Sequence, residues 1–371
     1  MRILHVITSL KKAAGTSVFC SEVCNGLVAA GHEVTTADVD PEAQDCCPID
    51  QRVKRISISS LLHDSARSTW QTNSKLLTSN FELIHIHALW SPILHRTFVW
   101  ARKNKIPIVL SPHGMLAPWA MRHKWWKKCV PWHLYQRRDL LRVDMFHATS
   151  KQEGTWIREL GFTQPITVVP LGTKLPDLRP LAAKQDKVLL FVGRIYPVKA
   201  LDRLIQAFAE VSFEVRREWR LRLVGPDQAG HRKSLELLVK SLGLGNCVEF
   251  AGPKFDEELN AEYDACDCLA LVSHTENLGA TVVDAMAHGK PVITSVNTPW
   301  REVSERGCGW WVSNEPRELA EALAEMMALT DDERRHMGAC ARKLVEEKYT
   351  WDSAVREMEK GYMAMTKQMG L

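Results

Sequence analysis

The chain has 371 residues, of which 45% are hydrophobic and 25% are charged, and its formal net charge is +4. This length exceeds what one hydrophobic core comfortably organises, so two domains are expected. The composition excludes a disordered, collagen-like or repetitive protein, and the mild charge gives no reason to expect a nucleic-acid partner.

The first residues, MRILHVITSLKK, form a short apolar run that precedes two lysines, whereas a signal peptide has its positive charge first. We therefore expect a first β-strand here and a cytoplasmic protein, because no apolar run approaches the roughly 20 residues that cross a bilayer. The ten cysteines do not form the two closely spaced ligand pairs of a structural zinc site. Reduced thiols are expected, with no metal and no cofactor.

Short β-branched runs alternate with helical patterns along the first half. A helix is predicted where Phe19, Val23 and Leu27 recur every four residues, and Gly31 would end it. Strands are predicted, in chain order, at Ile3–Thr8, Glu33–Val39, Leu83–His87, Ile106–Leu110, Met145–Thr149 and Ile166–Val169.

A proline-containing stretch without periodicity, residues 171–187, is the expected linker. Alternation then resumes, and it predicts parallel sheets built from right-handed crossovers. We predict an α/β protein of two Rossmann-like, doubly wound domains, residues 1–175 and 176–351, with ligands bound between them at the carboxyl ends of strands. A final helix, residues 352–371, is expected to pack back on the first domain. The later strands are predicted at Val188–Val192, Leu221–Val224, Val248–Phe250, Leu269–Val272, Val292–Ser295 and Trp310–Val312.

Two segments of the second half carry residues suited to chemistry. In FVGRIYPVK, Gly193 permits a tight exit from a strand, and Arg194 and Lys199 lie before a helix, where cations suit a diphosphate. In SHTENLGATVVDAMAHGKPVITS, a loop carries Glu276 ahead of a helix, and Asp284 follows eight residues later, so the two acids can reach different parts of one ligand. The alternative is that these are ordinary solvated or helix-capping side chains.

With these segments the chain resembles the large retaining glycosyltransferase family four. The resemblance also includes, in chain order, AAGTSVFCSEVCNGLVAAGHEV, SPHGML, ATSKQE, TPWREV and GCGWWV. It spans nearly the whole chain and implies the two-domain GT-B fold. It implies a metal-independent transfer, with retention, from a UDP- or GDP-linked sugar donor to a glycan or lipid-linked saccharide acceptor, in surface polysaccharide biosynthesis.

The resemblance also implies roles for individual residues. Arg194 and Lys199 match the pair that contacts the donor diphosphate, and Glu276 matches the acid near the donor sugar. Asp284 matches the acid that holds the ribose, and His113 matches a residue that faces sugar and acceptor. The further donor-binding positions are Gly15, Gly193, Asn277, Leu278, Gly279, Ala280 and Thr281.

The chain departs from the family pattern at four places. The usual Gly-Gly is Ala14-Gly15, and the usual Lys-Gly is Lys199-Ala200. Leu171 replaces the asparagine of a Pro-Asn-Gly linker motif, and Asp284 stands where glutamate is common. These changes bear on loop geometry and on the ribose contact, but none removes a charge from the diphosphate site.

Two other features suggest binding surfaces. His85 and His87 share one face of a predicted strand, but two ligands do not make a metal site, so they are interpreted as structural or cleft-lining. Residues 119–142 interleave seven basic residues and five aromatic ones with a single acid, Asp139. This pattern suits an anionic membrane surface, such as the inner face of the cell membrane. The alternatives are a wall that binds an anionic acceptor, a solvated helix, or a nucleic-acid site.

Three other functions compete with a transferase. A non-catalytic scaffold would bind a nucleotide sugar without turning it over. Another GT-B enzyme, such as a phosphorylase or an epimerase, would carry different chemistry on the same fold. A nucleic-acid binder would show salt-dependent oligonucleotide binding that nucleotide sugars do not affect.

Overall fold

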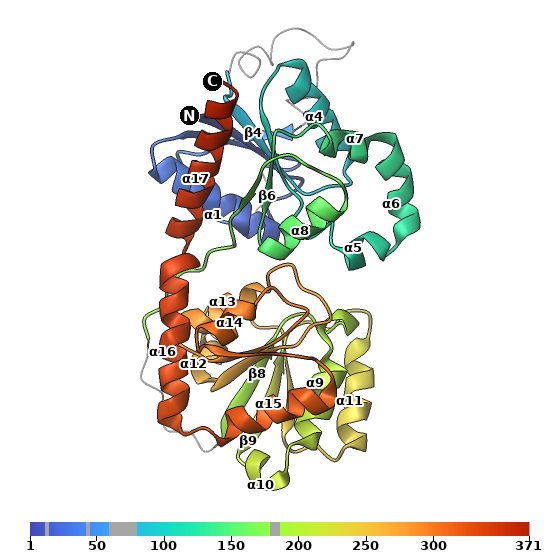
Figure 1. Cartoon of the computed structure of the whole chain (residues 1–371), viewed down its shortest axis with the longest axis vertical. Helices are drawn as coiled ribbons and strands as arrows, with labels where there is room; N and C mark the ends of the chain where they lie inside the picture. The colour runs from blue at the N-terminus through green and yellow to red at the C-terminus, as the bar shows by residue number, and fades with distance from the viewer. Residues whose placement is uncertain (12–14, 42–44, 59–79, 179–185, 371) are drawn as a thin grey trace. The chain divides into compact units, whose positions relative to one another are not determined.

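The computed structural model describes residues 1–11, 15–41, 45–58, 80–178 and 186–370. The chain forms two compact units: unit 1 comprises Met1–Gly172 and Trp351–Leu371, and unit 2 comprises Thr173–Thr350 (Figure 1). Each unit is built on one parallel sheet, of seven strands in unit 1 and six in unit 2. The predicted α/β class with two Rossmann-like domains is therefore confirmed.

The sheet of unit 1 has the strand order β3-β2-β1-β4-β5-β6-β7. Its strands are β1 (Arg2–Val6), β2 (Glu33–Asp38), β3 (Lys54–Ser57), β4 (Leu83–His87), β5 (Ile108–Ser111), β6 (Met145–Ala148) and β7 (Ile166–Val168). The helices are α1 (Gly15–Ala29), α4 (Pro92–Lys103), α5 (Pro118–Arg122), α6 (Trp125–Pro131), α7 (Arg137–Leu140), α8 (Lys151–Glu159) and α17 (Trp351–Gln368).

Successive residues of these strands enter two different cores, because side chains alternate between the faces of a sheet. Ile3 and Leu83 pack under α1 and α17 in one core, whereas Leu4 and Ile84 belong to the core on the opposite face. Helices α1 and α17 lie side by side, although they are separated by most of the sequence. The last helix thus completes the fold of the first unit.

Gly26 of α1 gives a measure of this helix packing. A Cβ at this position would lie 2.2 Å from Cγ2 of Val355 on α17, whereas a Cβ at Gly154 of α8 would meet its nearest atom at 3.8 Å. We expect Gly26→Ala to lower the free energy of unfolding by about 1–3 kcal/mol through overpacking. Gly154→Ala, the matched control, should be neutral or stabilising by up to about 1 kcal/mol, since alanine favours helix. Equal effects in denaturant unfolding would contradict this packing.

The sheet of unit 2 has the strand order β10-β9-β8-β11-β12-β13. Its strands are β8 (Lys187–Val192), β9 (Trp219–Val224), β10 (Val248–Gly252), β11 (Cys268–Leu271), β12 (Val292–Ser295) and β13 (Gly309–Val312). Its α-helices are α9 (Leu201–Glu210), α10 (Phe213–Arg216), α11 (His231–Ser241), α12 (Asp256–Ala265), α13 (Ala280–Ala287), α14 (Arg301–Glu305), α15 (Pro316–Ala328) and α16 (Asp331–Lys348).

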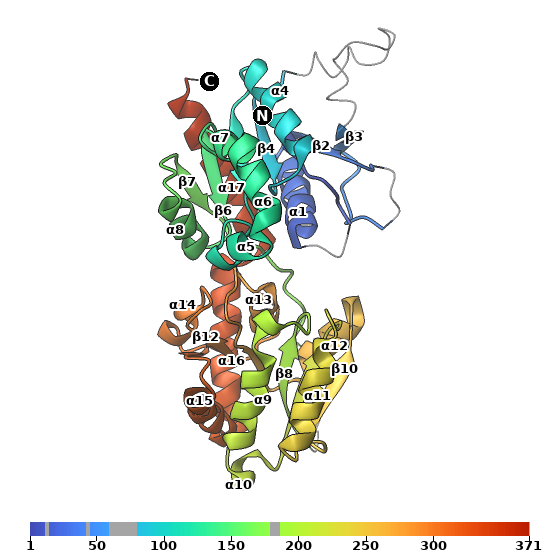
Figure 2. The same ribbon diagram turned by 90° about the vertical axis from the view of Figure 1, so that its right-hand side faces the viewer.

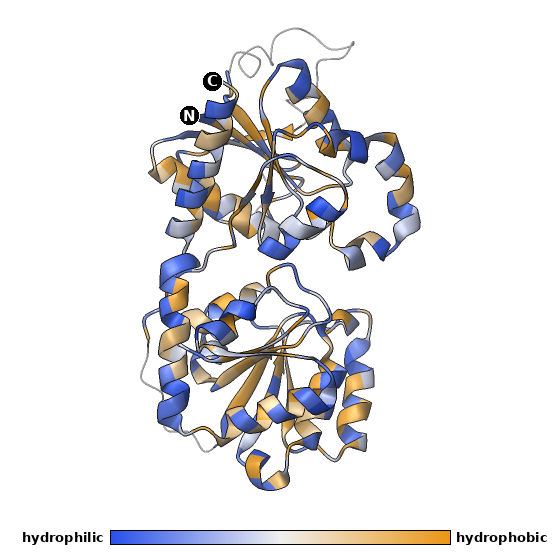
Figure 3. Ribbon diagram, in the orientation of Figure 1, coloured by the Kyte–Doolittle hydropathy of each residue, from blue (hydrophilic) through white to orange (hydrophobic). Residues whose placement is uncertain are grey.

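Helices cover both faces of this sheet, because right-handed crossovers reverse side where the strand order reverses. Helix α9 contacts α11 and α15, while α13 contacts α16 (Figure 2). The strands between them are mostly hydrophobic, whereas the helices carry both hydrophobic and hydrophilic residues (Figure 3). None of the helices in the described ranges is both long enough and apolar enough to cross a membrane.

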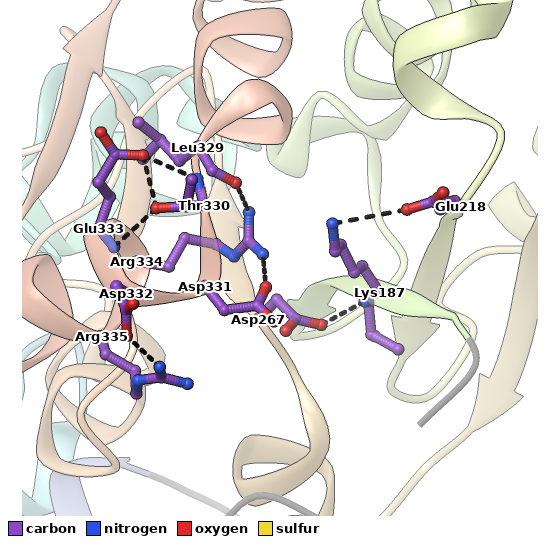
Figure 4. A network of polar contacts seen from close by, with 11 residues as sticks. Lys187, Glu218, Asp267, Leu329, Thr330, Asp331, Asp332, Glu333, Arg334 and Arg335 are labelled. Atoms are coloured by element: carbon purple, nitrogen blue, oxygen red, sulfur yellow. Dashed lines mark hydrogen bonds and ion pairs between the residues drawn. The ribbon is translucent and has the colours of Figure 1, made fainter. Parts of the chain in front are cut away.

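A polar network stabilises the amino ends of β8 and β11 (Figure 4). Thr330 and Glu333 form a reciprocal capping box at the start of α16, and Arg334 donates to the Leu329 carbonyl. Asp267, just before β11, accepts from the Val188 amide at 2.7 Å. Since ligands bind at the carboxyl ends of parallel strands, this network has a structural role and the site lies at the opposite edge.

Candidate functional site

The strand order of each sheet reverses at one point, between β1 and β4 in unit 1 and between β8 and β11 in unit 2. The loops that leave two such strands run in opposite directions and open a crevice beyond their carboxyl ends, where ligands bind in open parallel sheets. In unit 2, the two segments that carry the predicted site residues follow β8 and β11. The topology therefore brings them to one place.

The loop after β8 begins at Gly193 and places its cations at the sheet edge. A Cβ on Gly225, at the end of β9, would overlap the Gly193 carbonyl at 1.8 Å, so the two loops pass closely. Arg194 is exposed, and its Nη1 donates to Oε1 of Gln228 at 2.7 Å. Ala200 has a φ of 52°, a left-handed conformation for which glycine is better suited. The usual glycine of the family is therefore replaced at a strained position.

Lys199 and Glu276 form an ion pair across the switch point. The Lys199 ammonium donates to Oε1 of Glu276, which also accepts from the Ser273 hydroxyl at 2.8 Å. Their side chains are only 14% and 13% exposed. The His274 amide donates to the Val198 carbonyl at 2.9 Å, so the two loops are also joined through their backbones. The predicted cation and acid therefore meet directly.

Helix α13 begins beside this pair. Gly279 has a φ of 78°, and a Cβ on it would lie 2.6 Å from the Leu271 side chain, so the entry to the helix requires glycine. The buried indole of Trp300 donates to the Leu278 carbonyl and fixes the preceding turn. The first-turn residues Ala280 and Thr281 thus present the amino end of α13, with its partial positive charge, at the sheet edge.

Asp284 lies on the second turn of α13. Burial raises the pKa of its carboxyl group to about 6. Its Oδ1 accepts from the hydroxyl of Thr173, at the start of unit 2, at 2.7 Å. Thr173 was not predicted, because its segment has no periodicity and the contact joins residues far apart in sequence. One oxygen of the Asp284 carboxyl group therefore already accepts a hydrogen bond from within the protein.

His113 lies at the carboxyl edge of unit 1, after β5. It has a left-handed φ of 51°, and Gly114 follows with 77°. Its Nε2 lies 3.1 Å from Nδ1 of His87. Burial lowers the pKa of His113 well below its usual value, so the imidazole is neutral at pH 7. A neutral ring can exchange hydrogen bonds with sugar hydroxyls without adding charge.

Glu153 of α8 supports the loop that carries His113 and was missed as a site residue. Its buried carboxyl group accepts from the Gly114 amide, and from the amide and hydroxyl of Thr149 at 2.7 and 2.9 Å. Glu153 is the last residue of the ATSKQE segment, which belongs to the family resemblance and could have indicated it as a site residue. The sequence did not show which backbone it would hold.

Gly15 is the first residue of α1. Ala14, the departure that precedes it, falls outside the described residues. Gly15 and His113 belong to unit 1, whereas the other predicted site residues belong to unit 2.

Residues 119–142 form α5, α6, a π-helical turn and α7. Trp119, Trp125 and Trp126 are exposed by 43%, 63% and 61%, whereas Trp132 packs against the core of unit 1. The only acid of this segment, Asp139, is buried against His95 at 2.8 Å, so its exposed charges are basic. The sequence pattern grouped all five aromatic residues on one binding surface, but Trp132 and Tyr135 pack within unit 1. The Tyr135 ring stacks on His95. The Lys128 ammonium, likewise, donates to the Ala120 and His123 carbonyls.

Each half of the chain matches the model of a known glycosyltransferase family. Residues 13–175 match the family model "Glycosyltransferase Family 4", and residues 178–344 match "Glycosyl transferases group 1". A D-inositol 3-phosphate glycosyltransferase of Kineococcus radiotolerans is 38% identical over 35% of this chain and 34% of its own length. That of Geodermatophilus obscurus is 30% identical, and the chain spans 48% of it. That of Thermobispora bispora is 27% identical over 85% of this chain and 82% of its own.

Solved structures share the fold over the whole chain. Sucrose-phosphate synthase from Thermosynechococcus elongatus has a TM-score of 0.75 at 19% identity, covering 99% of this chain and 100% of that one. Anabaena HepE, solved in complex with UDP and glucose, has a TM-score of 0.71 at 17% identity, covering 98% and 100%. At these identities the likeness shows the architecture alone, which is that of GT-B glycosyltransferases.

Proposed function

Because this chain belongs to the glycosyltransferase family four, with a group 1 transferase domain, we propose that it transfers a sugar from a nucleotide diphosphate donor to an acceptor hydroxyl. The observation that carries the proposal is the Lys199–Glu276 pair beside the amino end of α13. A UDP-linked donor is favoured over a GDP-linked one, since the HepE structures and a trehalose-6-phosphate protein of E. coli hold UDP or UDP-sugars.

The proposed chemistry follows from the leaving group. Breaking the bond between sugar and phosphate develops negative charge on the departing diphosphate, which Arg194, Lys199 and the first amides of α13 would stabilise. These side chains and amides can carry that charge without a metal ion. Glu276 would hold the donor sugar and share Lys199 with the phosphate. The acceptor hydroxyl would attack from the side that the leaving group vacates, giving retention, and its proton would pass to an oxygen of the departing diphosphate. His113 would contact the sugar.

Two acceptor classes have separate support. The exposed basic and aromatic side chains of residues 119–142 favour a lipid-linked saccharide, as in surface polysaccharide synthesis. The name of the curated relatives favours D-inositol 3-phosphate. Release of nucleoside diphosphate from UDP-glucose and GDP-mannose, with each acceptor present in turn, distinguishes them. Tight donor binding with no turnover for any acceptor would favour a non-catalytic scaffold instead.

We further propose that the exposed side chains of residues 119–142 bind an anionic membrane surface, where tryptophan rings settle among the headgroups. The intact chain is expected to float with phosphatidylglycerol vesicles. Lys124→Gln with Lys127→Gln should weaken binding about 30-fold, since each basic residue adds about 1 kcal/mol. Lys128 is left intact, because its ammonium is bound to backbone carbonyls.

The matched control is Lys233→Gln with Lys240→Gln, which removes two exposed lysine charges on α11 of unit 2, outside the segment. It should float like the intact chain. An intact chain that stays unbound to anionic vesicles at low salt would contradict the membrane proposal, and it would leave the donor site untouched.

The raised pKa of Asp284 predicts a pH dependence of donor binding. Its folded pKa of about 6 lies above the usual value of about 3.9, so the acid stabilises the fold best when protonated, and this contribution falls as pH rises through 6. Ribose hydroxyls, in contrast, would bind the carboxylate, which forms above pH 6. We expect Asp284→Asn to weaken UDP binding about 10- to 150-fold at pH 7.5, since a hydrogen bond to a charged group contributes about 1.5–3 kcal/mol.

The quantity to measure is the dissociation constant of UDP for Asp284→Asn divided by that for the intact chain. This ratio is used because the phosphate of UDP also titrates near pH 6 and affects both constants. Isothermal calorimetry should show this ratio shrinking towards one as the pH is lowered to 5. A ratio that stays constant from pH 5 to 8 would show that this carboxyl group does not hold the ribose.

A further inference from the structure

A strip of histidines crosses the interior of unit 1. His5 of β1 pairs in register with His85 of β4, and His87 follows on the same face, under α1 and α17. His147 of β6 belongs to the same strip, and all four rings are completely buried. Two residues earlier along the same three strands, this face carries Ile3, Leu83 and Met145.

Two of these histidines are accounted for by hydrogen bonds, as buried polar groups normally are. His85 lies 2.5 Å from the Tyr362 hydroxyl through Nδ1, and 2.5 Å from the Ser111 hydroxyl through Nε2. His147 contacts Ser111 at 2.6 Å through Nδ1, and the Val169 carbonyl at 2.8 Å through Nε2. Both rings use both nitrogens, so they need no further ligand.

His5 is not accounted for in this way, whereas His87 contacts His5 through one nitrogen and His113 through the other. Nδ1 of His5 lies 3.0 Å from Nε2 of His87, and Nε2 of His5 is buried without a hydrogen-bond partner among the described residues. A neutral imidazole has one N–H group and one lone pair, so either tautomer leaves Nε2 unsatisfied, at a cost of about 1–3 kcal/mol. A metal ion shared with His87 would bind through Nδ1, the nitrogen that faces His87. The buried thiol of Cys20, on α1, lies against the same two rings.

We propose that His5, His87 and Cys20 bind a transition metal ion such as zinc. One ligand atom from each residue lies within 4.8 Å of the others. Two nitrogens and a sulfur that share a tetrahedral zinc ion, at about 2.0–2.3 Å from it, are separated by roughly 3.3–3.6 Å. The two nitrogens, now 3.0 Å apart, would separate slightly, and the thiol, within 4.8 Å of both, would move closer to them. Nitrogen and thiolate ligands select zinc, cobalt or copper over hard ions such as magnesium.

The surroundings supply an outer contact of the kind that metal-bound histidines use. The other ring nitrogen of His87 faces Nε2 of His113 at 3.1 Å, and such a contact fixes the tautomer and orientation of a ligand. The ion would thereby orient His113, and this link alone rests on the proposed function. The spacing of the cysteines gave no sign of the site, because its ligands come from β1, α1 and β4 and meet only in the fold.

Metal content tests the proposal directly. Because the three ligands are buried, the ion must enter during folding, so the full chain is produced in zinc-supplemented medium and, separately, refolded with zinc. We expect about one equivalent of zinc by mass spectrometry of the folded chain, with release of the thiol proton on binding. Refolding with cobalt should give a thiolate-to-cobalt absorption band.

Cys20→Ser should lose the zinc and the cobalt band, while Cys308→Ser, the matched control at a buried cysteine of unit 2, should keep both. His5→Gln gives a second loss variant should Cys20→Ser fail to fold, and circular dichroism establishes folding in each case. The proposal is overturned if the folded intact chain holds no zinc after both preparations, or if both loss variants hold as much as it does. None of these readouts depends on sugar transfer.

Discussion

Lys199→Met is expected to lower the rate of sugar transfer about 100- to 1,000-fold, the usual effect of removing one preorganised group that stabilises a developing negative charge. The side chain is 14% exposed, so little water can replace its charge beside the leaving diphosphate. The substitution also leaves the Glu276 carboxylate without its cation, and this unpaired negative charge would repel the phosphate. We therefore expect both weaker donor binding and slower turnover, measured as nucleoside diphosphate release.

Arg222→Met is the matched control for this prediction. Arg222 forms a comparable ion pair with Glu262, at 26% and 12% exposure, on the sheet of the same unit but away from the loops after β8 and β11. It should lower the thermal stability of the chain without changing turnover per folded molecule. Equal losses of turnover in both variants would mean that the effect of Lys199 is one of stability.

Glu153→Gln is expected to lower the free energy of unfolding by about 2–3 kcal/mol and to slow transfer at least tenfold. The carboxyl group is fully buried and accepts three hydrogen bonds, so an amide nitrogen in place of one oxygen would face an N–H or O–H donor. The Gly114 backbone would then move, and His113 with it. Glu153 acts here as a positioning residue.

The separation of turnover from binding distinguishes this role from a general loss of stability. At a temperature where Glu153→Gln is fully folded, kcat should fall while the dissociation constant for UDP stays unchanged, since the proposed nucleotide site is in unit 2. Glu159→Gln, an exposed acid on the same helix, should change neither quantity. Unaltered kcat in folded Glu153→Gln would show that the Gly114 contact does not matter for transfer.

Local pattern was sufficient to predict most of the fold. Each predicted strand is present, with ends within two residues of those predicted, because buried parallel strands are short β-branched runs between helical segments. The missed strand is β3, Lys54–Ser57, at the edge of the sheet. Its sequence, Lys-Arg-Ile-Ser, has three polar residues among four and resembles a loop, and its pairing with β2 is what makes it a strand.

The site was predictable as segments but not as contacts. Loop and helix starts placed Lys199 and Glu276 at strand ends, but their ion pair joins residues 77 positions apart and depends on β8 and β11 being neighbours. The contact of Thr173 with Asp284 and the meeting of His5 with Cys20 depend on tertiary packing in the same way. Neither the hydrophobic periodicity nor a sequence motif encodes these tertiary contacts.

The proposed function requires that the carboxyl ends of β8 and β11 hold a nucleoside diphosphate. A crystal structure of the intact chain with UDP tests it most directly. We expect phosphate oxygens within hydrogen-bond distance of Arg194, Lys199 and the first amides of α13, with the ribose at Asp284. A UDP molecule bound elsewhere, with those side chains untouched, would contradict it.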